Sequence, residues 1–277
     1  MSTDLHTRYV TSADGTRIAY TRRGNGPAVV LVDGALCYRR AGITPLLLDP
    51  LSEHFTVYAY DRRGRDESGD TAPYSLDREI EDLRAVAAAT GETPYVCGFS
   101  SGAALAMHAL AEGLPVRGAA LYEAPYTVVD DGDRVPPADC VTVLERMVAQ
   151  DRRGDAVRYF MATMIGMPGV VVTMMKLFMR TMWRNTTAVA HTLPYDIGLM
   201  NRSRFRPPAE VSARIAAPTT VLHGERTAPA LRRATVALAG QIPGARLVVV
   251  PKAKHYVKPD VLVPALLDIF VEDKHYA

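Results

Sequence analysis

Short apolar runs alternate with helix-like segments in the first half of the chain and again near its end. The apolar runs that have the length of buried strands are residues 28–32, 55–60, 93–97, 116–122, 218–224 and 245–250. The segments predicted as helices are residues 75–90, 103–112, 230–241 and 259–271. Strands that alternate with helices are typical of a parallel sheet covered on both faces, so the sequence predicts an α/β fold with a mostly parallel sheet flanked by helices.

An Asp-Gly pair divides the first strand-like segment of the chain. Residues 10–20 are predicted to form two short strands around Asp14 and Gly15, a pair that favours tight hairpin turns. Strands joined by such a turn run antiparallel. We therefore expect an antiparallel strand pair at one edge of the sheet.

The alternation stops between about residues 127 and 208, where helical periodicity continues without a convincing strand. The predicted helices are residues 138–150, 155–165 and 170–190. Nine of the eleven methionines lie between Met147 and Met200, and Lys176, Arg180 and Arg184 form a narrow charged stripe on the third helix. The pattern predicts a helical cap, residues 127–208, inserted into a core formed by residues 1–126 and 209–277.

The five residues from Gly98 to Gly102, Gly-Phe-Ser-Ser-Gly, stand between a predicted strand and a predicted helix. A G-x-S-x-G sequence in that position is typical of a nucleophile elbow, in which a serine sits on a strained turn with its hydroxyl exposed at the sheet edge. Small flanking residues are needed where the strand doubles back into the helix. Ser100 is therefore the candidate nucleophile.

Composition narrows the classes of partner. The chain has 277 residues, 48% of them apolar, with 32 basic and 30 acidic side chains and a formal net charge of +2. A nearly balanced charge gives no strong attraction to nucleic acid or to an anionic membrane, so we expect neither partner and instead a small-molecule substrate. The sequence makes no prediction of the oligomeric state.

The N-terminal residues and the cysteines of the sequence favour a reducing compartment. The first residues lack the basic and apolar regions of a secretory signal, and the longest uncharged stretch, residues 159–175, is interrupted by glycine and proline. Cys37, Cys97 and Cys140 form neither a CxxC pair nor an even set. We therefore expect a cytoplasmic protein without disulfides, a structural zinc site or another metal.

Three motifs together resemble the α/β-hydrolase family. They are the Gly98–Gly102 elbow, the segment Asp-Arg-Arg-Gly-Arg-Asp-Glu-Ser at residues 61–68, and residues 243–251 leading to His255. The resemblance covers nearly the whole chain. It implies a nucleophile, an acid and a histidine in that chain order, an oxyanion hole of two backbone amides, a helical cap, and no metal or organic cofactor.

The catalytic acid departs from the family pattern. His255 follows the last predicted strand, where the family keeps its base, but Thr227 stands where the family normally has an aspartate. Glu123, at the end of the neighbouring strand, is the favoured acid. Glu225 is an alternative, and so is a site with no charged third member.

The loop expected to form the oxyanion hole also differs from the family pattern, because Asp33 and Gly34 replace the usual His-Gly. The amides of Ala35 and Ser101 can still point two donors at an oxyanion, since backbone donors do not depend on side-chain identity. A carboxylate nearby would repel that charge. We therefore expect Asp33 to be structural, facing away and bonded to loop amides or to an arginine.

Serine at the elbow favours acyl chemistry, so the prediction is a hydrolase of a carboxylic ester, lactone or thioester with an apolar body. C–C bond cleavage or lyase or cyclase chemistry is an alternative, and a ligand-binding protein with a degenerate triad is a second. Tyr195 and Asp196 are either polar groups of the pocket or a helix stop. The residues expected to line the substrate pocket are Leu36, Phe99, Met161, Met164, Met175, Trp183 and Tyr256.

Overall fold

A computed structural model describes residues 6–128 and 135–272 of the chain. Its centre is an eight-stranded sheet in the order β1-β2-β4-β3-β5-β6-β7-β8. The strands are β1 (Arg8–Thr11), β2 (Arg17–Arg23), β3 (Ala28–Val32), β4 (Thr56–Tyr60), β5 (Tyr95–Phe99), β6 (Gly118–Tyr122), β7 (Thr219–Gly224) and β8 (Arg246–Val250). β2 pairs antiparallel with β1 and β4, and all other pairs are parallel. The mostly parallel sheet with an antiparallel edge is confirmed.

Helices cover both faces of the sheet, which explains why the central strands are apolar throughout. On one face α1 (Thr44–Ser52) and α11 (Pro259–Glu272) pack on alternate strand residues such as Leu31 and Cys97. On the other face α2 (Leu76–Ala88), α3 (Ser101–Ala111) and α10 (Pro229–Gln241) pack on residues such as Val30 and Val96. The short helix α9 (Ala209–Ser212) packs against α3.

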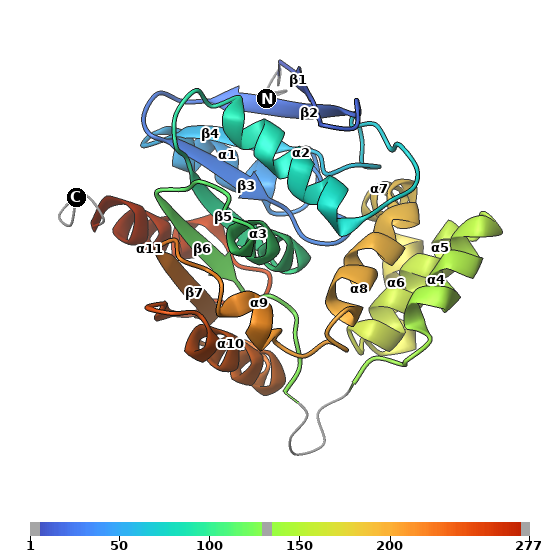
Figure 1. Cartoon of the computed structure of the whole chain (residues 1–277). Helices are drawn as coiled ribbons and strands as arrows, with labels where there is room; N and C mark the ends of the chain where they lie inside the picture. The colour runs from blue at the N-terminus through green and yellow to red at the C-terminus, as the bar shows by residue number, and fades with distance from the viewer. Residues whose placement is uncertain (1–5, 129–134, 273–277) are drawn as a thin grey trace.

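The segment between β6 and β7 is helical, and its described residues form no strand. Its elements ahead of α9 are α4 (Cys140–Ala149), α5 (Arg153–Tyr159), a π-helix (Phe160–Met164), α6 (Gly169–Phe178), α7 (Arg180–Ala188), a 3₁₀ turn (Ala190–Thr192) and α8 (Leu193–Asn201). Figure 1 shows α4 to α8 grouped together to one side of the sheet. Their buried residues continue the core of the α3 face, as Leu144 and Ile197 illustrate. The predicted all-helical insertion is thus present, and its boundaries at 127 and 208 remain a prediction.

One prediction for this helical segment is wrong, and one alternative that the sequence left open is excluded. The single helix over residues 170–190 is divided at Met179, whose backbone (φ −107°, ψ 54°) is not helical, so Lys176, Arg180 and Arg184 do not form one continuous stripe. Tyr195 and Asp196 do not stop a helix, because both lie inside α8. Pro194 falls in the first turn of α8, where proline is compatible with a helix start.

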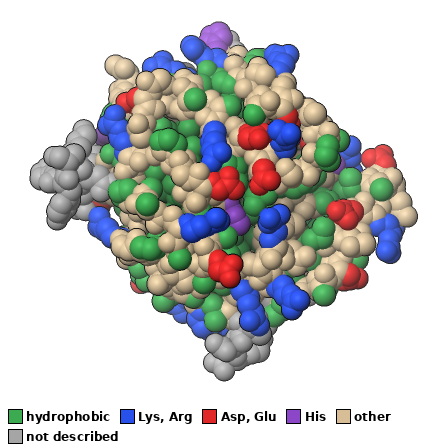
Figure 2. Space-filling view, viewed as in Figure 1, with side chains coloured by type: hydrophobic (Ala, Val, Ile, Leu, Met, Phe, Trp, Pro, Cys, Tyr) green, Lys and Arg blue, Asp and Glu red, His purple; other side chains and the backbone are tan. Residues whose placement is uncertain are grey.

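Charge of both signs is spread over the surface seen in Figure 2, where acidic and basic side chains alternate around the centre of the view. Exposed apolar side chains gather on α6, where Val170, Leu177 and Phe178 are 69%, 55% and 74% exposed. Within the described part of the chain no helix combines the length and the apolar character needed to cross a membrane.

Candidate active site

Ser100 sits between β5 and α3 in the strained geometry expected of an elbow. Its φ of 53° and ψ of −124° are unusual for a residue with a side chain, and its amide donates to the carbonyl of Tyr122 at 2.9 Å. A Cβ at Gly98 would lie 2.6 Å from the Cα of Ala103, and one at Gly102 only 2.1 Å from the carbonyl oxygen of Val32. The two glycines therefore permit the close crossing that forces Ser100 into this turn.

His255 and Glu123 are in direct contact. Nδ1 of His255, in the loop after β8, lies 2.7 Å from Oε2 of Glu123, the residue that follows β6. The Glu123 side chain is completely buried, whereas that of His255 is 36% exposed. β5, β6, β7 and β8 are parallel neighbours, so Ser100, Glu123 and His255 all follow the carboxyl ends of strands at one edge of the sheet.

Two further donors hold the Glu123 carboxylate. The amide of Gly224 donates to Oε1 at 2.8 Å, and the hydroxyl of Thr227 donates to the same oxygen. Burial raises the pKa of Glu123, but its hydrogen bonds lower that pKa by more, so the net pKa lies below the ordinary value. Glu123 is therefore ionised at neutral pH, and Nδ1 of His255 carries the proton between them, which leaves Nε2 free to accept one.

The other candidate acid faces elsewhere. Oε2 of Glu225 accepts a hydrogen bond from the amide of Lys252 at 2.7 Å, on the exposed side of the loop that carries His255. A second hydrogen bond also holds this loop, because the hydroxyl of Tyr122 donates to the carbonyl of Lys254 at 2.7 Å. Glu225 thus shapes the loop and does not contact the imidazole.

The loop after β3 passes directly over the elbow. A Cβ built on Gly34 would lie 3.0 Å from Cβ and 3.6 Å from Oγ of Ser100, so glycine lets the loop come this near without displacing Ser100. Ala35 follows at once. The loop of residues 33–37 is therefore placed where its amides can face a group bound to Ser100.

Asp33 does not have the partners expected of it. Its side chain is buried, and neither carboxyl oxygen has a hydrogen-bond partner among the described residues. The expectation that loop amides or an arginine bind it is wrong, because Arg62 contacts only its backbone carbonyl, at 3.2 Å. Burial raises the pKa of Asp33 to about 7, although the positive charges of Arg65 and Arg62 oppose that rise.

The residues predicted to line a pocket fall into different surroundings. Met161 and Leu36 are buried, and Met164, Met175 and Trp183 are partly buried against the same core. Phe99 lies in the core of the opposite face, with its ring 6.4 Å from that of Tyr122. Tyr256 is 84% exposed, with its ring edge-on to His255 at 5.7 Å.

A buried ionic cluster beside the elbow was not predicted from the sequence. Asp196 of α8 is fully buried and accepts hydrogen bonds from Arg62, Arg65 and the hydroxyl of Ser101. Glu79 binds the other edge of the Arg62 guanidinium, at 2.8 and 2.7 Å. One signal was available, because Asp196 is the lone carboxylate between Asp155 and Glu210.

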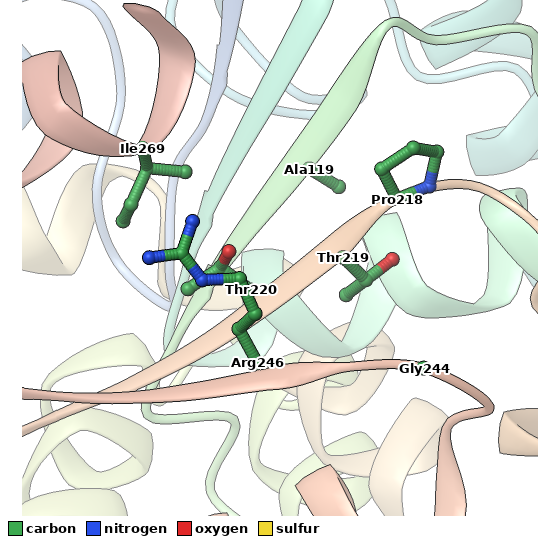
Figure 3. A pocket seen from close by; sticks show the side chains of 7 residues that line it. All are labelled: Ala119, Pro218, Thr219, Thr220, Gly244, Arg246 and Ile269. Carbon is green, nitrogen blue, oxygen red and sulfur yellow. The ribbon is translucent and has the colours of Figure 1, made fainter. Parts of the chain in front are cut away.

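Two other features do not belong to this site. The carboxylates of Asp61, Asp66 and Glu67 lie close enough together to hold a metal ion, but Arg39 and Arg40 already bind them. A small cavity of about 70 Å³ lies among the first residues of β6, β7 and β8, the opposite edge of the sheet from Ser100 (Figure 3). Its lining residues are Ala119, Pro218, Thr219, Thr220, Gly244, Arg246 and Ile269.

Comparison with known proteins identifies the family and the fold of the chain. The family model described as "Alpha/beta hydrolase family" matches residues 14–265. The solved structure of an alpha/beta hydrolase from Sphaerobacter thermophilus is 45% identical in sequence, with a TM-score of 0.87 over 95% of this chain and 100% of that one. A thermophilic esterase from Thermogutta terrifontis shares the fold at 19% identity, with a TM-score of 0.67 over 97% of this chain and 99% of its own.

A curated relative matches over a shorter region. The pimeloyl-[acyl-carrier protein] methyl ester esterase of Stenotrophomonas maltophilia is 33% identical over 148 residues, which is 48% of this chain. The match covers 55% of that esterase, so about half of its length has a counterpart here.

Proposed function

Because the chain belongs to the α/β-hydrolase family, we propose that it is a serine hydrolase that cleaves a carboxylic ester, lactone or thioester through an acyl-enzyme on Ser100. The observation that carries this proposal is the 2.7 Å contact between Glu123 and His255. A histidine that is held and charge-stabilised by a buried carboxylate at the same sheet edge as a serine elbow is suited to act as a general base.

The first step is attack of Ser100 on the substrate carbonyl. Oγ forms the bond to carbon while Nε2 of His255 takes the hydroxyl proton, and Glu123 stabilises the imidazolium that results. His255 then gives this proton to the leaving oxygen or sulfur. In the second half of the reaction, water attacks the acyl-enzyme with the same base and frees Ser100.

The charge that develops on the carbonyl oxygen needs donors already in place. We assign this role to the amides of Ala35 and Ser101, which follow Gly34 and Ser100 in the chain. The close approach of Gly34 to Ser100 supports this assignment, since a Cβ at Gly34 would lie 3.6 Å from Oγ. Amides fixed by folding stabilise the oxyanion without reorganising during the reaction.

An uncharged substrate with an apolar body fits the surroundings best. The buried guanidiniums next to the elbow, Arg62 and Arg65, are already bound by Glu79 and Asp196, so they do not offer a charge to a substrate carboxylate. We place the apolar wall in the cap, residues 127–208, at Met161, Met164, Met175 and Trp183, with Leu36 and Tyr256 on the core side. Phe99 is left out because it packs in the opposite core. The esterase named above, a partial relative, supports ester chemistry.

The test is fluorophosphonate labelling followed by intact-mass measurement, with turnover of a panel of p-nitrophenyl esters and lactones. We expect one adduct, located on Ser100 by peptide mapping, and hydrolysis of at least one short apolar ester. Ser100→Ala is the matched control and should lose both. Absence of an adduct on the wild-type protein would contradict an activated serine, whereas an adduct without hydrolysis would favour the lyase-type or ligand-binding alternatives.

A further inference from the structure

Asp196 joins the helical segment to the catalytic edge of the sheet. Its Oδ1 accepts from the Ser101 hydroxyl at 2.7 Å, from Nη1 of Arg62 at 2.7 Å and from Nη2 of Arg65 at 2.9 Å, and Oδ2 accepts from the same Nη2 of Arg65 at 2.8 Å. All four residues are at most 1% exposed. Burial raises the pKa of Asp196, but the charges of Arg65 and Arg62 and the Ser101 hydroxyl lower it by more, so the carboxylate is ionised.

Arg65 links Asp196 to the loop of residues 33–37, because its guanidinium binds both. Its other terminal nitrogen, Nη1, donates to the carbonyl of Gly34 at 2.6 Å and to that of Cys37 at 2.9 Å. The carbonyl of Gly34 and the N–H of Ala35 belong to one peptide group, which is planar and trans, so the two point in opposite directions. Holding the carbonyl toward Arg65 therefore aims the amide of Ala35 away from it.

Ser101 supplies the second contact. Its hydroxyl is bound to Asp196, and its backbone N–H is the other donor assigned to the oxyanion hole. Arg62 Nη1 adds weaker contacts at 3.3 Å to this hydroxyl and at 3.2 Å to the carbonyl of Asp33. One carboxylate thus reaches both oxyanion donors, directly at Ser101 and through Arg65 at Ala35.

We propose that Asp196 is a positioning residue that fixes the oxyanion hole and makes its geometry depend on the docking of α8. The inference rests on the proposed function, because it assumes that the amides of Ala35 and Ser101 face the reacting carbonyl. The oxyanion exists only in the transition state and the tetrahedral intermediate, so loss of this support lowers kcat and leaves KM nearly unchanged.

The test compares Asp196→Asn with the wild-type enzyme. The amide side chain keeps the shape but loses the charge that holds Arg65. We expect kcat to fall about 10- to 100-fold with KM within about twofold, less than the loss caused by removing one oxyanion donor outright. In hydrogen exchange measured by mass spectrometry, peptides that span residues 33–37 should exchange at least about tenfold faster, since the loop loses an anchor.

Tyr195→Phe is the matched control, since it removes one exposed hydroxyl contact of α8, to Asp70, and keeps the ring that stacks on Tyr74. We expect it to match the wild type in both measurements. If Asp196→Asn does not fold, Arg65→Lys replaces it, because a lysine ammonium cannot span Asp196 and both loop carbonyls as the guanidinium does.

Exchange and kinetics separate the two proposals. Unchanged exchange over residues 33–37 in a folded Asp196→Asn protein overturns the positioning role, whatever its activity, and so does a rise in KM at constant kcat. A wild-type enzyme that neither reacts with fluorophosphonate nor hydrolyses any ester contradicts the proposed function instead. In that case the exchange result still decides whether Asp196 holds the loop of residues 33–37 in place.

Discussion

Thr227 donates its hydroxyl hydrogen to the carboxylate of Glu123. Thr227 occupies the position where the family resemblance implies an aspartate, so the residue at the usual acid position binds the proposed acid on the neighbouring strand end. Gly224 adds its amide to the same carboxylate oxygen at 2.8 Å. The turn after β7 therefore contributes hydrogen-bond donors to the carboxylate that contacts the histidine, and it does not contribute a negative charge of its own.

Glu123→Gln should lower kcat by about 10³-fold. Thr227 and Gly224 both donate to Oε1, so the oxygen of the new amide will be held there and its NH₂ group will face His255. An NH₂ group facing Nδ1 stabilises the imidazole tautomer with its proton on Nε2, which cannot accept the proton of Ser100. Steady-state ester hydrolysis measures this.

Glu225→Gln is the control for that prediction. Its carboxylate binds the amide of Lys252 and does not contact His255, so turnover should stay within about twofold of the wild type. Near-wild-type turnover of Glu123→Gln, or a large loss in Glu225→Gln alone, would sink the assignment of Glu123 as the acid.

Thr227→Val should destabilise the protein at pH 7 by about 1.5 to 3 kcal/mol, the usual worth of a hydrogen bond to a charged group. The pKa of Glu123 is lowered in the folded state, so the stability it contributes is present above about pH 4.5 and is lost as the pH falls through the folded pKa. The difference between variant and wild type should therefore shrink below pH 4. Urea unfolding at pH 7 and at pH 3 measures both values.

Thr235→Val is the matched control for this pH dependence. Thr235 is also buried, but its hydroxyl donates to the neutral carbonyl of Leu231 at 2.8 Å. Its substitution should cost about 1 kcal/mol at both pH values. A Thr227→Val penalty as independent of pH as this control would show that Thr227 does not stabilise the charged form of Glu123.

Much of the candidate site could be predicted from the residues that directly follow the strands. The carboxyl ends of adjacent parallel strands lie at one edge of the sheet, so the residues that follow β5, β6 and β8 could be grouped from the hydrophobic pattern alone. The 2.7 Å contact of Glu123 with His255 agrees with that expectation. Local patterns suffice here because each residue is placed by its own strand.

The ionic cluster could not be found in this way. Asp196 binds Arg62 and Arg65 across sequence separations of 134 and 131 residues, and those contacts depend on how α8 packs against the core. The interruption of the helix at Met179, which shows no glycine or proline signal, was not predicted either. Asp33 was misjudged for a related reason, because the arginines near it bind Asp196 and Glu79.

Gly102→Ala should destabilise the protein by about 3 kcal/mol or more, since its Cβ would lie 2.1 Å from the carbonyl oxygen of Val32 and 2.5 Å from that of Asp33. Both atoms are backbone and cannot rotate away. For a chain of this size we expect Tm to fall by about 6 to 12 °C.

The control is Gly240→Ala, in α10, where nothing lies within 4 Å of the new Cβ. This variant should instead stabilise the protein by about 0.5 to 1 kcal/mol. Equal thermal shifts in the two variants would contradict the steric account of the elbow.

Asp33→Asn should stabilise the protein at pH 8 and much less at pH 4.5. The pKa of Asp33 is about 7 in the folded protein and 3.8 in the unfolded reference, so the folded state binds the extra proton between these values. The contribution of Asp33 to the wild-type stability therefore falls as the pH rises from about 4 to about 7, by about 4 kcal/mol in total, and is constant above that. An asparagine does not titrate and avoids this cost.

Urea unfolding at pH 4.5, 6 and 8 measures that difference, with Asp49→Asn as the control. Asp49 is 56% exposed and pairs with Arg23, so its substitution should change stability by less than about 0.5 kcal/mol at each pH. An Asp33→Asn protein whose gain does not grow between pH 4.5 and pH 8 would mean that burial does not hold the proton on Asp33. Its turnover at pH 6 should equal that of the wild type within about threefold, because the wild-type carboxyl is then mostly protonated and as neutral as the amide.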